Sequence, residues 1–100
     1  MTVSIDSQRF IQAEFPKLDS FTQQIVKVHG AHHPELAEVR ELFVAITAKL
    51  QNDLDAADLS PEFQQLQAVT DNYAIPDDAC EAYQATYQLL HQFQTLALAE

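Results

Sequence analysis

The chain has 100 residues, a length typical of one domain, and we expect a single domain over residues 1–100. It carries 15 acidic and 5 basic residues, and the resulting net charge of −10 disfavours binding to nucleic-acid phosphates and to anionic membrane surfaces. At 47% hydrophobic residues the sequence is too apolar for intrinsic disorder, yet no apolar run is long enough to span a bilayer.

The first predicted helix begins at Asp6 and ends at His29. One glycine and the lack of β-branched runs favour helices throughout. Pro16 predicts a kink or a short break, because proline lacks a backbone donor. Gly30 is expected in a left-handed conformation after the helix, with His29 in the last turn. The positions of one helix face step by three and four residues: Ile11, Glu14 or Phe15, Leu18, Phe21, Ile25 and Val28.

The second predicted helix starts at Pro34, a favourable first helical residue, and extends to about Ala57. Acidic residues in its first turns suit the positive end of the helix dipole. Its predicted buried face comprises Leu36, Val39, Phe43, Ile46, Leu50 and Leu54, with Leu42 at its edge.

Two further helices follow. Ser60 is a candidate N-cap, with Pro61 at the first helical position of a short third helix. Residues 75–78 predict a turn before the fourth helix, which runs to the end of the sequence. The expected buried positions are Phe63, Leu66, Val69 or Thr70, and Tyr73 in the third helix, and Cys80, Tyr83, Tyr87, Leu90, Phe93 or Gln94, and Ala97 in the fourth.

Four helical segments joined by short connections predict an all-α fold, an up-down helical bundle. Short connections place consecutive helices antiparallel to each other. The third helix is short, so we expect a bundle that is regular at one end and irregular at the other.

Three of the four histidines crowd the first connection. His29, His32 and His33, with Glu35, are candidate metal ligands, since imidazole and carboxylate bind zinc and iron. Gly30 and Pro34 interrupt the helix between them, which favours the alternative of a polar turn without a metal. His91 stands alone and is expected to be a packing residue.

Cys80 is the only cysteine, so the chain cannot form an internal disulfide, and we expect a reducing, cytoplasmic setting. Residues 1–15 lack the basic start and apolar stretch of a secretory signal. A reactive thiol near a helix start is one interpretation of Cys80. Its place on the apolar stripe with Tyr83 and Tyr87 favours the other, a small buried hydrophobic residue.

No pattern of catalytic residues is present in the sequence. It contains no Gly-rich phosphate loop, no Cys-x-x-Cys and no His-Glu-x-x-His. The acids Asp53, Asp55 and Asp58 lack the glycine of a calcium loop. We therefore expect a protein that is not an enzyme.

Two stretches resemble a known family. They are residues 25–39, IVKVHGAHHPELAEV, and residues 70–83, TDNYAIPDDACEAY, followed by Tyr87. Both resemble the haemerythrin-like domain of the iron–sulfur cluster repair di-iron proteins, also called regulators of cell morphogenesis and NO signalling. Phe15-Pro16-Lys17-Leu18 resembles a further segment of that family. The resemblance implies a four-helix bundle in which His and Glu residues, two pairs of them spaced His-x-x-x-Glu, hold two iron ions.

The implied iron ligands are missing from this sequence. The match places Gln8 and Asp53 where the family has histidines, and Ala57 where it has a glutamate. The segment that carries the next ligand is shortened, and the last ligand pair would begin near Glu100. None of the four histidines has a glutamate four residues later. The resemblance therefore implies a shortened relative without the di-iron site, and we expect no cofactor.

The predicted function is that of a non-catalytic helical module that binds a protein partner or regulates one. Self-association as a homodimer is an alternative, if Phe10, Phe63 or Leu98 is left uncovered. A second hypothesis is a metal-binding protein that uses His29, His32 and His33, including between protomers. A third is a thiol sensor acting through Cys80.

Overall fold

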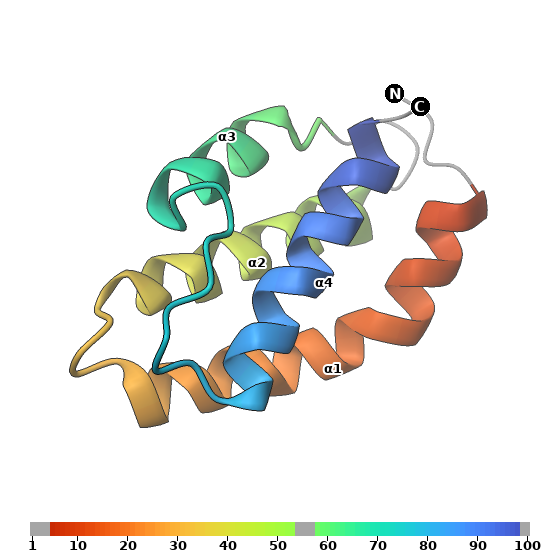
Figure 1. The fold of residues 1–100 in the computed structure, drawn as a ribbon. Helices are drawn as coiled ribbons and strands as arrows, with labels where there is room; N and C mark the ends of the chain where they lie inside the picture. The colour runs from red at the N-terminus through yellow and green to blue at the C-terminus, as the bar shows by residue number, and fades with distance from the viewer. Residues whose placement is uncertain (1–4, 54–57, 99–100) are drawn as a thin grey trace.

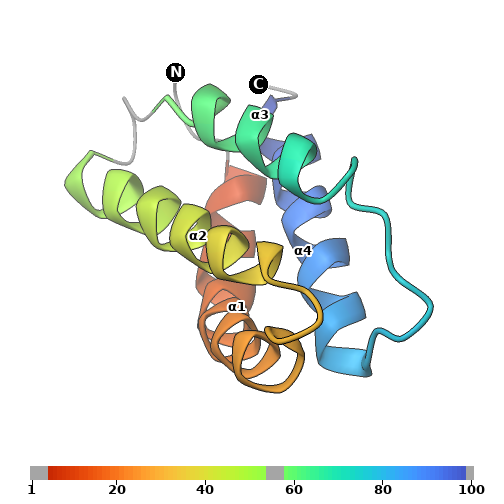
Figure 2. The same cartoon turned by 90° about the vertical axis from the view of Figure 1, so that its left-hand side faces the viewer.

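The computed structural model describes residues 5–53 and 58–98, and within these ranges the fold is an all-α four-helix bundle without strands. The helices are α1 (Ile5–His29), α2 (Glu35–Asn52), α3 (Ser60–Val69) and α4 (Glu81–Leu98). Figure 1 shows consecutive helices reversing direction, so the predicted up-down order is confirmed. α1 packs against both α2 and α4, and α3 packs against α2. Figure 2 shows the four helices arranged around a common interior.

Four phenylalanines, one from each helix, meet in the centre of the bundle. The ring of Phe15 on α1 lies 5.1 Å from that of Phe43 on α2 and 5.0 Å from that of Phe93 on α4. Phe63 on α3 reaches Phe93 at 5.8 Å. All four side chains are at most 8% exposed. We call these four residues the phenylalanine cluster, and it joins all four helices in one apolar core.

α1 continues through Pro16 without the predicted break. Figure 1 shows instead that the first part of α1, drawn in red, runs at an angle to the orange remainder. Proline removes one helical hydrogen bond and its ring collides with the carbonyl four residues earlier, here that of Gln12, which bends a helix. The rest of the buried stripe differs slightly from the prediction. Val28 is 61% exposed, while Thr22 is buried and its hydroxyl donates to the Leu18 carbonyl at 2.7 Å.

The predicted boundaries of α2 and α3 need correction. α2 begins at Glu35, one residue after the predicted start, and Pro34 is its N-cap, with φ −62° and ψ −21°. α2 ends at Asn52 because Asp53 is extended (φ −156°), and residues 54–57, with the predicted Leu54, lie outside the described residues. Ser60 is already helical rather than the N-cap, and its N–H donates to the Asp58 carboxylate at 3.1 Å. That bond lowers the pKa of Asp58.

Most of the expected positions on these helix faces are buried. Of the three residues considered for a dimer contact, Phe63 is not available. Phe63 is only 1% exposed, as its helix face predicted, so it leaves no uncovered surface for a dimer. Phe10 is half-buried and stacks on Phe93 at 5.7 Å, whereas Leu98 is 48% exposed. The described helices include none with the length and apolar character required to cross a membrane.

Gly30 does not adopt the predicted left-handed conformation, since no glycine here has a positive φ. Its N–H continues the helical pattern and donates to the Val26 carbonyl at 3.0 Å. A Cβ at this position would lie 2.4 Å from the same carbonyl oxygen. Glycine is therefore required here for space, because the oxygen in contact belongs to the backbone and cannot swing away.

Replacing Gly30 with alanine is expected to lower the free energy of unfolding by about 1–3 kcal/mol, the usual cost of forcing extra volume into a packed site. Urea denaturation followed by circular dichroism measures this change. Ala31→Ser, at the next, exposed position, is the control and should change the unfolding free energy by less than about 0.5 kcal/mol. Equal stability of Gly30→Ala and the wild type would show that the turn accepts a side chain.

Candidate functional site

Polar and aromatic side chains gather at the end of the bundle where α1 ends and α2 and α4 begin. His33 lies between two carboxylates: its Nδ1 is 3.1 Å from Glu35 Oε1, and its Nε2 is 2.9 Å from Asp78 Oδ2. The hydrogen bond to Asp78 raises the pKa of His33 above 6.5 and lowers the pKa of Asp78 below 3.8. This contact ties the connection before α2 to the connection before α4.

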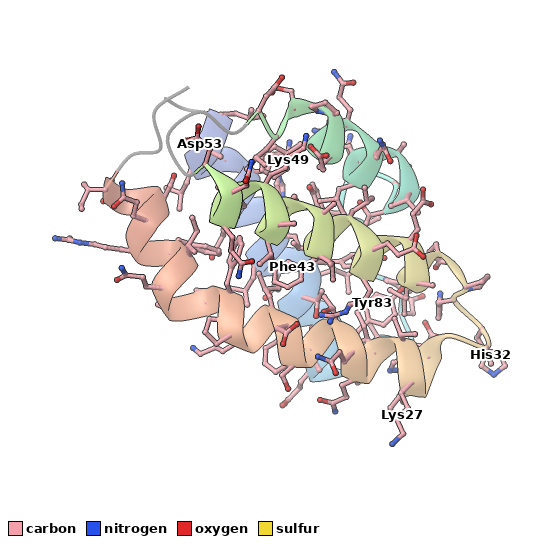
Figure 3. The ribbon with its side chains drawn as sticks, turned by 180° about the vertical axis from the view of Figure 1, so that it is seen from behind. Lys27, His32, Phe43, Lys49, Asp53 and Tyr83 are labelled. Carbon is pink, nitrogen blue, oxygen red and sulfur yellow. The ribbon has the colours of Figure 1, made fainter. Side chains whose placement is uncertain are left out.

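Tyr83 lies beside this ion pair, inside the bundle (Figure 3). Its ring is 5.3 Å from that of His29, 5.4 Å from that of His33 and 5.1 Å from that of Tyr87. Tyr83 is fully buried, and burial raises its pKa, so the phenol stays protonated at neutral pH. Within residues 5–53 and 58–98, its hydroxyl and His29 Nε2 are buried without a hydrogen-bond partner. Such unsatisfied groups are costly in an apolar interior.

The predicted metal ligands do not converge in one chain. His29 and His33 face each other with ring centres 6.5 Å apart, but His32 is exposed at the tip of the first connection (Figure 3). Both ring nitrogens of His33 already face carboxylates. In the part of the chain that the structure describes, no group of three or more His, Cys, Asp or Glu could hold a metal ion. The geometry therefore gives the metal hypothesis no support within a protomer.

His91 packs flat on Tyr73, with ring centres 4.9 Å apart and planes inclined by 10°. This contact agrees with its predicted role as a packing residue. Cys80 is exposed, so the prediction of a small buried residue is wrong. The reason is that α4 begins at Glu81, one residue after the cysteine, and the buried stripe begins at Tyr83.

A left-handed turn follows α3 where the sequence predicted one more helical turn reaching Tyr73. Asp71, Asn72 and Tyr73 have φ of 53°, 62° and 62° in succession. Each such residue costs roughly 1–2 kcal/mol, least for Asp and Asn. The turn directs Tyr73 inward, where its hydroxyl donates to Gln94 Oε1 at 2.6 Å. The Asp-Asn pair was the signal in the sequence, since these residues tolerate positive φ.

An open apolar groove of about 560 Å³ lies between α1 and α2. Its lining residues include Phe15 and Pro16 from α1 and Phe43 and Val44 from α2. Asp19 and Arg40 also line the groove and pair across the two helices, with Arg40 Nη1 2.7 Å from Asp19 Oδ1. The sequence did not predict this groove, although Pro16, where a kink was expected, is one of the residues that line it.

No family model matches the sequence, and no solved structure shows a significant match to it. The functional argument therefore depends on the side chains themselves.

The ion pair at His33 makes stability depend on pH. His33 has a raised pKa in the folded state, so its contribution is complete below pH 6.5 and is lost as the pH rises through that raised value. Asp78 has a lowered pKa, so its contribution is present above pH 3.8 and is lost on acidification. The unfolding free energy of the wild type should therefore fall more between pH 5.5 and pH 8.5 than that of Asp78→Asn.

Asp77→Asn is the matched control, because it removes the same charge one residue away and should retain the wild-type pH dependence. Urea denaturation at the two pH values measures both variants. If Asp78→Asn and Asp77→Asn show the same pH dependence, the pair of His33 and Asp78 contributes nothing to stability.

Proposed function

We propose that this chain is a non-catalytic binding module and that the groove between α1 and α2 receives a basic, amphipathic helical segment of a protein partner. The observation that carries this proposal is the open apolar groove of about 560 Å³ between the two helices. A helix presents apolar side chains at three- and four-residue spacing, which suits a groove that runs between two helices.

Exposed apolar side chains along the groove supply the attraction. Val44 is 46% exposed and lines the groove, so a partner would remove that surface from water. Phe15 and Phe43 form the apolar wall beneath it. These two rings belong to the phenylalanine cluster, so the wall is already rigid before a partner arrives and little ordering is needed on binding.

Charge favours a basic partner. The chain has a net charge of −10, and an acidic surface accelerates and orients the approach of a cationic segment. Arg40, the cation that lines the groove, is already paired with Asp19. Glu41 precedes Val44 by three positions and therefore lies on the same edge of α2, where it can pair with a lysine of the partner.

We further propose that the chain is a relative of the iron–sulfur cluster repair di-iron proteins that has lost the iron site. The two resembling stretches, residues 25–39 and 70–83, support this proposal, together with the order of the four helices. Gln8 lies half-buried on α1, and Asp53 is exposed after α2, at two positions where the family has histidines. Binding of a partner would then be what remains of the ancestral role.

A synthetic amphipathic peptide of leucine and lysine, labelled with fluorescein, tests the groove by fluorescence anisotropy. Val44→Glu should weaken its binding by about tenfold or more, because burying a carboxylate against apolar surface costs well over 1.4 kcal/mol. Val28→Glu is the matched control: Val28 is 61% exposed, lies outside the groove, and the change in net charge is the same. This variant should bind within about twofold of the wild type.

Three outcomes would overturn the proposal. They are binding no tighter than to a scrambled peptide, an equal loss in both variants, and a wild-type dimer that Val44→Glu dissociates. The last would mean that a second copy of the chain fills the groove.

A further inference from the structure

The outward side of α4 is free of charge, although the chain as a whole is strongly acidic. Glu81 lies in the first turn of α4, and no Asp, Glu, Lys or Arg occurs in the rest of the helix, residues 82–98. The exposed sides of α1 and α2 do carry charges, among them Lys17 on α1 and Glu41 on α2. Surface helices usually present charged and polar residues on the side away from the core, and on α4 the charged ones are missing.

The exposed residues on this side of α4 have the spacing at which two helices pack side by side. That spacing alternates between four and three positions. We call the five exposed residues that follow it the neutral seam: Gln84, Gln88, His91, Thr95 and Leu98. An open hollow of about 490 Å³ lies along the seam and is lined by Gln88, His91, Gln92, Thr95 and Leu96. The hollow offers space for side chains of a second helix.

We propose that a second copy of this chain binds along the neutral seam, so that two α4 helices pack antiparallel around a two-fold axis near His91. Figure 1 shows α4, in blue, in front of α2, on the near side of the bundle. The groove between α1 and α2 has no lining residue from α4, so this interface does not depend on the proposed function.

Charge favours a second copy over a charged partner. A basic segment finds no carboxylate on the seam, and an acidic segment finds no lysine or arginine, so neither gains an ion pair for the water that it displaces. Two copies of a chain with a net charge of −10 repel each other wherever their acids meet. The neutral seam is a side on which they touch without placing acid against acid.

The side chains of the seam complement a copy of themselves. A glutamine amide both donates and accepts hydrogen bonds, as the identical surfaces of a two-fold interface require. Among the described residues, the side chains of Gln88 and Gln92 have no hydrogen-bond partner, so their amides are available. The Thr95 hydroxyl donates to the His91 carbonyl at 3.0 Å and keeps its lone pairs for an incoming amide. In the antiparallel pair, Gln88 of one copy faces Thr95 of the other.

The acids at the start of α4 determine the direction of the pair. Asp77, Asp78 and Glu81 gather at this end, and parallel helices would bring both sets together. Antiparallel helices keep the two sets apart by the length of α4, which is about 27 Å for 18 residues. A helix pair of this length buries roughly 1,000 Å² in total, the lower end for a specific interface, so we expect a reversible dimer with a Kd on the order of 100 μM.

Sedimentation velocity of the full chain, from about 10 μM to about 1 mM, tests the interface. The wild type should change from monomer to dimer over this range. Raising NaCl from about 50 to about 300 mM should strengthen the dimer, because salt screens the repulsion between two acidic chains. Gln92→Glu places two carboxylates close together near the two-fold axis and should weaken dimerisation by about tenfold or more.

Gln23→Glu is the matched control, because Gln23 is exposed on α1, away from the seam, and the change in charge is the same. It should dimerise within about twofold of the wild type. Circular dichroism should show the same helix content in both variants.

The single cysteine reports the direction of the pair. Cys80 is exposed and lies eleven residues before His91, so spin labels on the two copies should be about 35 Å apart in the antiparallel dimer. Double electron–electron resonance measures this distance. A separation below about 25 Å would show parallel helices and overturn the proposed geometry.

The proposal is also overturned if the wild type stays monomeric at about 1 mM, if Gln92→Glu dimerises as the wild type does, or if Gln23→Glu weakens the dimer equally. Val44→Glu should leave this dimer intact, since Val44 lies in the groove. A dimer that Val44→Glu dissociates would place the second copy in the groove and overturn both proposals. An intact dimer that fails to bind the peptide would overturn the groove alone.

Discussion

The contact between four phenylalanines is the interaction on which the rest of this bundle depends. Each helix contributes one ring, and Phe15 on α1 contacts both Phe43 and Phe93. A buried aromatic ring of this kind is worth about 1.5–3 kcal/mol, a large share of the 5–15 kcal/mol that stabilises a typical domain. Because the rings occupy the centre, polar groups are left at the two ends. There Lys49 joins Glu62 at one end, and His33 joins Asp78 at the other.

The position of the cluster also explains where open surfaces occur. Phe15 immediately precedes Pro16, so the same short segment of α1 supplies a central ring and the bend in the helix. The groove between α1 and α2 lies at this bend. A second cleft, of about 260 Å³ beside the connection between α3 and α4, has another cause, because α3 ends in a left-handed turn. Both surfaces thus arise where a helix departs from regular geometry.

The sequence predicted the helices and most of the core because apolar residues recur at helical spacing, as in Leu36, Val39 and Ile46. The sequence-based prediction failed at positions where contacts in the folded chain determine the local conformation. Gly30 is needed because the Val26 carbonyl is close, which spacing cannot reveal. Tyr73 fits the helical pattern yet leaves it, because its hydroxyl reaches Gln94. Of the candidate site, the sequence showed that three histidines crowd the first connection but did not predict the contact of His33 with the carboxylate of Asp78, 45 residues away.

The central claim is that apolar packing, without a metal, holds this fold together. The melting temperature of protein purified without a chelating column, measured in buffer, with excess EDTA and with added Fe²⁺, tests that claim most directly. A bundle held by its phenylalanine cluster melts at the same temperature in all three conditions, since a ligand that does not bind the native state cannot stabilise it. A melting temperature that falls by several degrees in EDTA, or rises by several in Fe²⁺, would contradict the account and restore a metal site.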